Sequence, residues 1–252
     1  MQFNHYTIII GMICGVILFY KLPVLTKKNS INMKYDIKVS VIIPARNEEI
    51  NLPNILSDLN NQTFHVHEVI CVDDNSEDRT PEIIKNIGVR GVNVSKLPSN
   101  WKGKPWACQC GAKAATGDTL LFIDADVRLS NTAIESLVCR FIKNKTPISV
   151  QPYHNVKKQH EYFSLFFNLV EICSTAMSFL NAKNTYGFFG PVLMISKELF
   201  DKHGGYDTVK NTAIEDFSLG NYYNKNGIQI NLFSGSNEIC FRMYPDSFSS
   251  VF

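Results

Sequence analysis

The stretch Asp118–Leu129 reads DTLLFIDADVRL, and it decides the fold. Its four consecutive apolar residues, 120–123, predict a short buried strand, and Asp124 and Asp126 follow directly after it. In open α/β sheets ligands collect beyond the carboxyl ends of the strands, and two carboxylates one residue apart can present oxygen ligands to one cation. The stretch therefore predicts a metal site facing a diphosphate. The alternative is a solvated turn, which an Asp-x-Asp sequence after a strand often forms.

Strand and helix patterns alternate along the rest of the chain. Apolar and β-branched runs predict strands at residues 39–43, 69–72, 91–97, 148–150 and 228–233. Between them, apolar side chains spaced i, i+3, i+4 and i+7 predict helices, the first with Asn47 as its N-cap. Strands separated by helices of this length are typical of a mostly parallel sheet with helices on both faces. We therefore expect an α/β fold.

Polar side chains follow three of the predicted segments at the same edge of this sheet. They are Asp73 with Asp74, Lys104, and Asp124 with Asp126. A carboxylate can accept hydrogen bonds from a nucleobase or ribose, a lysine supplies charge to phosphate, and Mg²⁺ or Mn²⁺ can bridge two phosphates. Together they indicate a nucleoside diphosphate site. The alternatives are turn and helix-cap roles for the two aspartates and a solvated loop position for the lysine.

The N-terminal region contains an apolar, uncharged run of about fifteen residues, Tyr6–Tyr20. This is just short of the roughly 17 to 25 residues that span a bilayer, but with flanking residues it could still cross. The positive charges follow the run, which indicates an uncleaved anchor with the remaining chain in the cytoplasm. These charges are Lys21, Lys27, Lys28 and Lys34. A buried core helix and a cleaved signal are the alternatives.

This interpretation divides the chain into a membrane anchor at residues 1–24, a linker at 25–38 and one domain at 39–252. A chain of 252 residues, 45% of them hydrophobic, can bury the core of one such domain. The net charge of +2 comes from scattered basic residues, so the sequence carries no nucleic-acid footprint. The seven cysteines stand mostly in apolar runs and indicate reduced thiols in a cytosolic compartment.

Several stretches resemble, in order and spacing, the inverting family 2 glycosyltransferases of the GT-A fold. They are VIIPARNEE at 41–49, VDDNSED at 72–78, GKPWA at 103–107, FIDADV at 122–127 and IEDF at 214–217. The resemblance covers roughly residues 38–242. Within that family, residues 149–154, 189–192 and 241–244 look closest to the bacterial 4,4'-diaponeurosporenoate glycosyltransferases. That group glucosylates a C30 carotenoid acid in staphyloxanthin-type pigment synthesis.

The resemblance implies a role for each matching residue. On the donor side, Pro44, Ala45 and Glu48 would line the nucleoside pocket, Asp74 would hold the base, and Lys104 would lie near the diphosphate. Asp124 and Asp126 match the family's Asp-x-Asp motif, Asp124 at the donor and Asp126 more surely a ligand of Mg²⁺ or Mn²⁺. On the other side, Asp216 would be the general base with Glu215 as the alternative, and Gly190 and Pro191 would face the acceptor.

The resemblance implies metal-dependent transfer of glucose from UDP-glucose to a lipid-soluble acceptor at the cell membrane. The favoured acceptor is a carotenoid carboxylic acid. Residues 161–180 predict a long apolar helix, which is either a core helix or an interfacial helix that presents such an acceptor. The alternatives are another lipid or polysaccharide acceptor and a truncated, non-catalytic partner subunit. A nucleotidylyltransferase is disfavoured, because residues 44–49 contain no glycine.

Members of this family usually continue into an interface helix and further membrane helices, whereas this sequence ends at Phe252. The resemblance therefore implies that the C-terminal membrane or interface part is absent.

Overall fold

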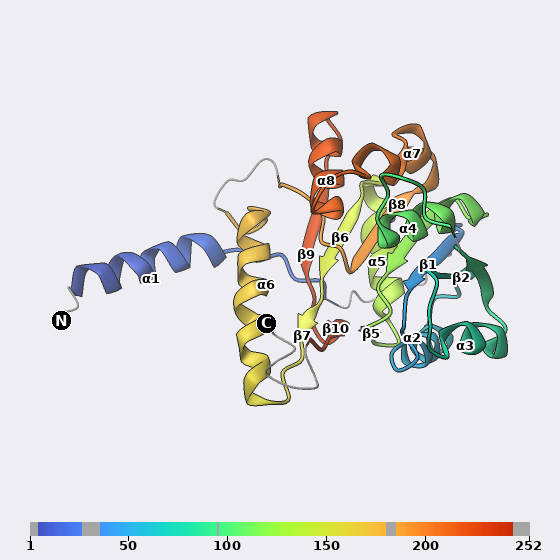
Figure 1. Cartoon of the computed structure of the whole chain (residues 1–252). Helices are drawn as coiled ribbons and strands as arrows, with labels where there is room; N and C mark the ends of the chain where they lie inside the picture. The colour runs from blue at the N-terminus through green and yellow to red at the C-terminus, as the bar shows by residue number, and fades with distance from the viewer. Residues whose placement is uncertain (1–4, 27–35, 95, 180–184, 244–252) are drawn as a thin grey trace.

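A twisted central sheet with helices on both faces forms the body of the molecule (Figure 1). The computed structural model describes residues 5–26, 36–94, 96–179 and 185–243. Within these ranges the main sheet has seven strands in the order β3-β2-β1-β4-β8-β6-β9. The strands are β1 Val39–Ala45, β2 Glu68–Asp73, β3 Arg90–Asn93, β4 Thr119–Ile123, β6 Ile148–Gln151, β8 Val192–Ser196 and β9 Asn231–Ser234.

Most neighbouring strands of this sheet run parallel, as the sequence predicts. Strands β3, β2, β1 and β4 form one parallel set, and β6 pairs with β9 in the same way. Strand β8 is the exception, since it is antiparallel to both β4 and β6. Because β1, β2 and β4 all point the same way, their carboxyl ends meet at one edge. Ala45 lies opposite Asp73 there, with Asp124 just beyond β4.

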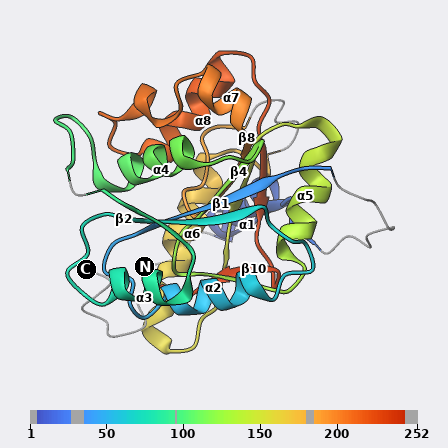
Figure 2. The same ribbon diagram turned by 90° about the vertical axis from the view of Figure 1, so that its right-hand side faces the viewer.

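Helices cover both faces of the sheet (Figure 2), and an apolar layer lies between the sheet and the helices on each face. Helices α2 Leu52–Asn60, α3 Thr80–Ile87 and α5 Ala133–Asn144 pack on one layer. Helices α4 Gly103–Ala114, α7 Lys197–Lys202 and α8 Glu215–Lys225 pack on the other, with the 3₁₀ helix η2 Gly205–Val209. The expected α/β fold with helices on both faces is confirmed.

A second, smaller sheet lies beside the end of the first. In the described part of the chain it contains β5 Val127–Leu129, β10 Ile239–Phe241 and β7 Tyr153–His154, in that order. Arg128 on β5 donates two hydrogen bonds to the Asp58 carboxylate of α2, at 2.7 and 2.8 Å. This pair joins the segment after Asp126 to the helix layer.

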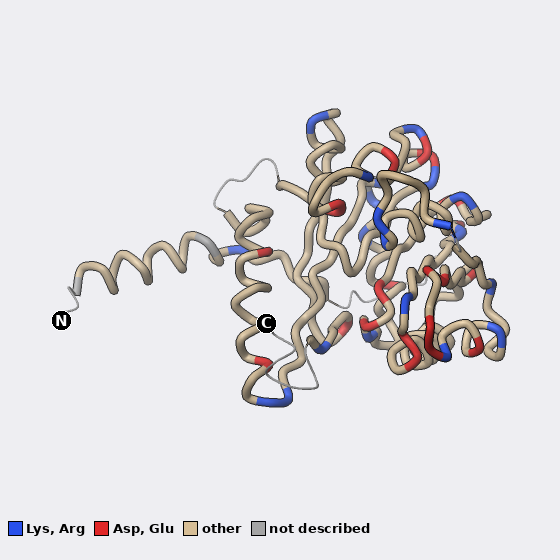
Figure 3. The backbone as a smooth tube through the Cα atoms, viewed as in Figure 1, with Lys and Arg blue, Asp and Glu red and all other residues tan. Residues whose placement is uncertain are grey.

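The first helix does not meet the prediction of a membrane-spanning anchor. Helix α1, His5–Phe19, has 15 residues and contains no Asp, Glu, Lys or Arg (Figure 3). None of the helices in the residues that the structure describes is long and apolar enough to cross a bilayer. Lys27, Lys28 and Lys34, on which the predicted orientation depends, lie outside the described residues. After α1 the chain returns to the main sheet, where Leu25 is buried and its N–H donates to the Ser234 carbonyl at 2.9 Å.

Helix α6, Tyr162–Ser174, lies along the side of the molecule beside β6 and β9 (Figure 1). Its buried residues are Ser164, Asn168 and Ile172, whereas most of its large apolar side chains are exposed. The exposed group contains Tyr162, Phe163, Phe166, Phe167, Leu169 and Val170. A core helix would bury these side chains, so that alternative is wrong for the described residues.

The predicted N-cap of the first helix of the domain is also wrong. Helix α2 begins at Leu52 after Asn51, and Asn47 lies in the preceding loop with a φ of 57°. The Asn47 N–H donates to the Ser76 hydroxyl at 3.0 Å, and its side-chain oxygen accepts from the Glu77 N–H at 2.8 Å. Asparagine tolerates this left-handed conformation, so it serves here to join two loops at the sheet edge.

Glu161, at the start of α6, is a fully buried carboxylate that Arg242 holds. Arg242 follows β10 and donates to Glu161 Oε1 from Nη2 at 2.5 Å and from Nε at 3.0 Å. The arginine hydrogen bonds lower the pKa of Glu161 to about 2, although burial opposes them. This ion pair fastens the last described segment to α6.

We expect Arg242→Ala to lower the free energy of unfolding by about 1.5 to 3 kcal/mol, because Glu161 loses its charged hydrogen-bond donor and keeps only backbone N–H donors such as that of Lys157. The depressed pKa means that the stabilisation is complete above about pH 4.5 and is lost as the pH falls towards 2. The difference between variant and wild type in urea unfolding should therefore shrink in acid. Arg79→Ala is the control, since its ion pair with Glu49 involves an arginine side chain that is 74% exposed and should contribute under about 1 kcal/mol. Equal effects of the two variants would contradict the buried ion pair.

Candidate active site

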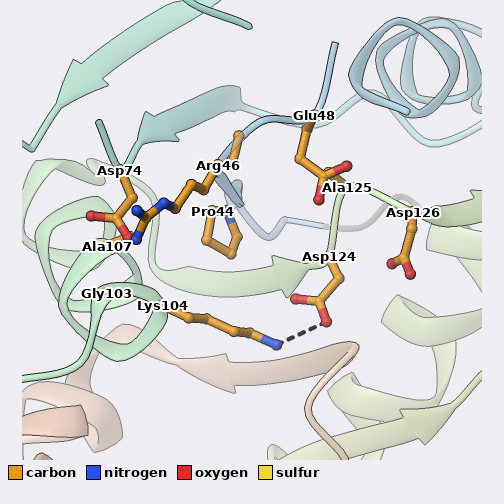
Figure 4. Close-up of a pocket in the computed structure, with 11 residues that line it drawn as sticks. Pro44, Arg46, Glu48, Asp74, Gly103, Lys104, Ala107, Asp124, Ala125 and Asp126 are labelled. Atoms are coloured by element: carbon orange, nitrogen blue, oxygen red, sulfur yellow. Dashed lines mark hydrogen bonds and ion pairs between the residues drawn. The ribbon is translucent and has the colours of Figure 1, made fainter. Parts of the chain in front are cut away.

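A cavity of about 360 Å³ opens at the carboxyl ends of β1, β2 and β4 (Figure 4). Its lining combines acidic, basic and small side chains from four segments of the chain. They are Pro44, Ala45, Arg46, Glu48, Asp74, Gly103, Lys104, Ala107, Asp124, Ala125 and Asp126. All seven residues that the sequence predicts for the donor and metal sites line this one cavity.

Asp74 lies at one end of the cavity, beneath the start of α4. Burial raises its pKa, and the Arg46 guanidinium, which extends towards it, opposes that rise (Figure 4). A Cβ atom on Gly103 would collide with the Asp74 carboxylate, so any other residue at the start of α4 would require that carboxylate to move. The preceding aspartate, Asp73, does not line the cavity. Its carboxylate accepts a hydrogen bond from the Ser76 N–H at 3.1 Å within the turn after β2.

Lys104 occupies the centre of the site, between two carboxylates. Its Nζ lies 2.8 Å from Asp124 Oδ2 and 4.0 Å from Asp216 Oδ2. Burial acts to lower the pKa of Lys104, but the two carboxylates outweigh it and raise that pKa far above its usual range. The lysine is therefore a permanent cation, and it is not the solvated loop residue of the alternative interpretation.

Asp126 lies at the other end of the cavity, beyond Asp124. Burial raises its pKa to about 6, and the nearby Asp124 and Glu48 carboxylates add to the rise. Within the described residues no cationic side chain forms an ion pair with Asp126, whereas Asp124 has Lys104. An added cation would therefore be stabilised most by Asp126.

The acidic pair fits a divalent cation that completes its shell with ligand oxygens. No group of three or more His, Cys, Asp and Glu side chains in the described ranges could hold a metal ion alone. Mg²⁺ commonly takes only one or two carboxylates and fills its other positions with phosphate oxygens and water. The cavity offers that arrangement at Asp124 and Asp126, so the residues present fit such an ion.

Asp216 approaches the same site from the first turn of α8. It is 8% exposed, and burial raises its pKa to about 6 although Lys104 and the Tyr206 hydroxyl oppose the rise. Gly190 leaves room for it, since a Cβ there would lie 2.6 Å from Asp216 Oδ2. The alternative base, Glu215, turns to another lysine and lies 4.0 Å from Lys102 Nζ.

The loop before β8 connects the two halves of the site. The Asp124 N–H donates to the Pro191 carbonyl at 2.9 Å, which places Gly190 and Pro191 between Asp124 and Asp216. The structure thus gathers every predicted site residue around Lys104, with Glu215 at the margin. Sequence reasoning missed Arg46, Gly103 and Tyr206. Gly103 could have been found, because a glycine at the start of a predicted helix indicates a close approach of the backbone. Nothing in the sequence around Tyr206 indicated a role in the site.

The match to a family model establishes what kind of protein this is. Residues 40–204 match the model described as "Glycosyl transferase family 2". The chain belongs to glycosyl transferase family 2.

Two relatives of this family 2 chain are named "4,4'-diaponeurosporenoate glycosyltransferase". The one from Staphylococcus haemolyticus is 37% identical over 84% of this chain and 58% of its own length. The one from Staphylococcus aureus is 32% identical over 96% of this chain and 65% of its own length. The family 2 chain thus spans about three fifths of these relatives.

A solved structure supports the fold. The family 2 chain is similar to glucosyl-3-phosphoglycerate synthase from Mycobacterium tuberculosis, solved with Mn²⁺, UDP and glucosyl-3-phosphoglycerate. The TM-score is 0.61 at 19% identity, and the match covers 89% of this chain and 81% of the other. At this identity the likeness shows a shared GT-A fold and carries no residue roles.

We expect Asp216→Asn to stabilise the protein at pH 7 by about 1 to 3 kcal/mol, because the ionised carboxylate is buried. The raised pKa means that this carboxylate stops destabilising the fold as the pH falls through about 6. The gain in urea unfolding should therefore vanish below about pH 4. Asp207→Asn, an exposed aspartate, is the control and should change stability by under about 0.5 kcal/mol. If Asp216→Asn is the less stable protein at pH 7, the carboxylate serves as a structural helix cap.

Proposed function

We propose that this chain is a metal-dependent inverting glycosyltransferase that transfers glucose from UDP-glucose to a lipid-soluble acceptor, a carotenoid carboxylic acid. One observation carries the proposal. Lys104 stands between Asp124, beside the candidate cation site, and Asp216, on the other side of the reaction centre. This arrangement provides separate groups for the departing diphosphate and for the attacking nucleophile.

The donor half of the proposal rests on the cavity at the carboxyl ends of β1, β2 and β4. Asp74 can accept hydrogen bonds from a nucleobase, and Pro44, Ala45 and Glu48 line the adjoining wall. Lys104 supplies a point charge to the diphosphate. The Mycobacterium tuberculosis protein was solved with UDP and Mn²⁺, which supports a nucleoside diphosphate as the ligand of this cavity.

A divalent cation, Mg²⁺ or Mn²⁺, would be held by Asp126 and Asp124. When bound, it would neutralise the charge that develops on the departing diphosphate. Asp126 is the more important of the two, since Lys104 already compensates Asp124. Lys104 then remains on the inner side, between the diphosphate and Asp216.

Asp216 would act on the acceptor. In an inverting transfer the nucleophile attacks the anomeric carbon from the face opposite the leaving group, and a hydroxyl nucleophile must lose a proton as it attacks. Asp216 Oδ2 faces Lys104 and Gly190, so it is suited to take that proton. A carboxylic acid acceptor is already ionised near neutral pH and requires no such step.

The acceptor class is inferred from α6 and from the names of the relatives. Six large apolar side chains stay exposed on α6, and α1 exposes a further apolar surface. Exposed apolar area on this scale marks a site for a membrane surface or a lipid-soluble molecule. We propose that the protein works at the cytoplasmic face of the cell membrane, where nucleotide sugars are available, and that the acceptor is the diaponeurosporenoate in its relatives' names.

The direct test is co-expression with a pathway that makes the carotenoid acid, followed by mass analysis of the extracted pigments. The proposal predicts a pigment heavier than the acid by one hexose. UDP release from UDP-glucose without any glycosylated pigment would instead favour another lipid or a polysaccharide as acceptor. Neither UDP release nor a product would favour a non-catalytic partner subunit.

We expect Asp126→Asn to weaken UDP binding in the presence of Mn²⁺ by at least about tenfold, or ~1.4 kcal/mol. The substitution removes the carboxylate that would contribute most to cation binding. Calorimetry with Mn²⁺ and with EDTA measures the effect, and the two conditions should differ for the wild type but hardly for the variant. Glu82→Gln, the same charge change on the exposed side of α3, should behave as wild type. Unchanged Mn²⁺-dependent binding by Asp126→Asn would contradict the assignment.

The loss caused by Asp216→Asn should depend on the acceptor. With a hydroxyl acceptor the variant loses a general base, an effect typically worth about 10² to 10⁴ in rate. With a carotenoid acid we expect only about a tenfold loss, because that nucleophile is already ionised. Turnover of a carotenoid acid and of the matching carotenoid alcohol measures the difference. Equal losses on both acceptors would remove the case for a base at this position.

A further inference from the structure

We propose that Tyr206 is a positioning residue for Asp216: its hydroxyl holds Oδ1 and so leaves Oδ2 as the oxygen that acts in the reaction. This inference rests on the proposed function, because it concerns the group that we assign to the acceptor side. It names a residue outside the family-like stretches, in the short 3₁₀ helix η2.

The two oxygens of the Asp216 carboxylate have different surroundings. Tyr206 Oη donates a hydrogen bond to Oδ1 at 2.7 Å. Within the described part of the chain Oδ2 accepts no hydrogen bond; it lies against Gly190 and 4.0 Å from Lys104 Nζ. A carboxylate fixed through one oxygen cannot rotate freely, so the other oxygen keeps one direction.

Tyr206 is itself held in place by packing. It is 2% exposed, and its ring meets those of Phe122 on β4 and Phe200 on α7 edge-on, with centroids 5.8 and 5.9 Å apart. Gly204 and Gly205 precede it with φ values of 75° and 54°, a turn that other residues rarely adopt. The hydroxyl therefore has a fixed position before any ligand binds.

Helix α4 controls both oxygens of Asp216. The side-chain oxygen of Gln109 accepts a hydrogen bond from the Tyr206 N–H at 2.9 Å, and Gln109 is 9% exposed. Lys104, on the first turn of the same helix, approaches Oδ2. One rigid element thus places the cation near the active oxygen and anchors the tyrosine that holds the other oxygen.

The hydrogen bond also favours the ionised form that a base requires. The charged and titratable groups that act on Asp216 are Lys104 and Cys108 from α4, Asp124 after β4, Glu215 from α8 and Tyr206 from η2. Burial, Asp124 and Glu215 raise the pKa of Asp216, while Lys104 and the tyrosine hydroxyl lower it. Removal of the hydroxyl should therefore leave Asp216 protonated to higher pH.

The test uses Tyr206→Phe, which keeps the ring and removes only the hydroxyl, and UDP-glucose hydrolysis, which needs no identified acceptor. In this reaction the water proton passes to Asp216 Oδ2, the water oxygen bonds to the anomeric carbon, and UDP leaves with the electron pair of the broken bond. We expect the acid limb of the pH–kcat profile to move up by about one unit, with about a fivefold lower kcat at pH 6, about a tenfold lower kcat at pH 5 and an unchanged KM for UDP-glucose.

Tyr223→Phe is the matched control. Tyr223 is fully buried, and its hydroxyl has no hydrogen-bond partner among the described residues. This variant should leave the pH profile where it is in the wild type. Equal shifts in both variants, or no shift in Tyr206→Phe, would overturn the proposal.

A second measurement separates this inference from the proposed function. The Asp216 carboxyl carbon can be titrated by NMR in wild type, Tyr206→Phe and Tyr223→Phe, with Asp216→Asn to assign its signal. The inference predicts a higher titration midpoint in Tyr206→Phe alone, whether or not the protein hydrolyses UDP-glucose. Such a shift without hydrolysis counts against the proposed function only, whereas an unmoved midpoint contradicts the positioning role.

Discussion

The arrangement of the site depends on one cation, the Lys104 ammonium, between the carboxylates of Asp124 and Asp216. Two carboxylates this close to each other in a partly buried site repel strongly, because the surroundings screen charge less than water does. The lysine compensates both, and its raised pKa keeps it charged at neutral pH. Asp126 receives less compensation, and that difference leaves one carboxylate suited to an external cation. The charge pattern thus distinguishes Asp126, which has no ion-pair partner among the described residues, from Asp124 and Asp216, which lie on either side of Lys104.

The fold brings these groups together through close packing. Helix α4 lies directly on β1 and β2 because Gly111 has no side chain, and a Cβ there would press into Ile42 and Val72. This close approach carries Lys104 to the sheet edge. Strand β8 then enters antiparallel beside β4, and the Pro191 carbonyl accepts from the Asp124 N–H. A larger residue at Gly111 or Gly190 would move the lysine or Asp216, so small side chains far apart in the sequence set the geometry of the charged ones.

Much of the fold and of the donor side could be predicted from the sequence, because both depend on local patterns. A buried run followed by Asp-Ala-Asp places two carboxylates at a strand end whatever the rest of the chain does. Asn47 was misjudged because its side chain bonds across to Ser76 and Glu77, some thirty residues away. Tyr206 could not be found, since its partner Asp216 and its anchor Gln109 meet it only in the folded chain. The apolar N-terminal run predicted a helix correctly, but none of the described helices is long and apolar enough to be the membrane-spanning anchor that was expected.

The most direct test of this account is a crystal structure of the protein with UDP and Mn²⁺, with the cation located by its anomalous scattering. The account predicts Mn²⁺ about 2.0 to 2.2 Å from an Asp126 carboxylate oxygen and bound to the diphosphate, with the uracil near Asp74 and Lys104 still between Asp124 and Asp216. A cation that contacts neither Asp124 nor Asp126, or UDP bound outside the cavity at the ends of β1, β2 and β4, would contradict it.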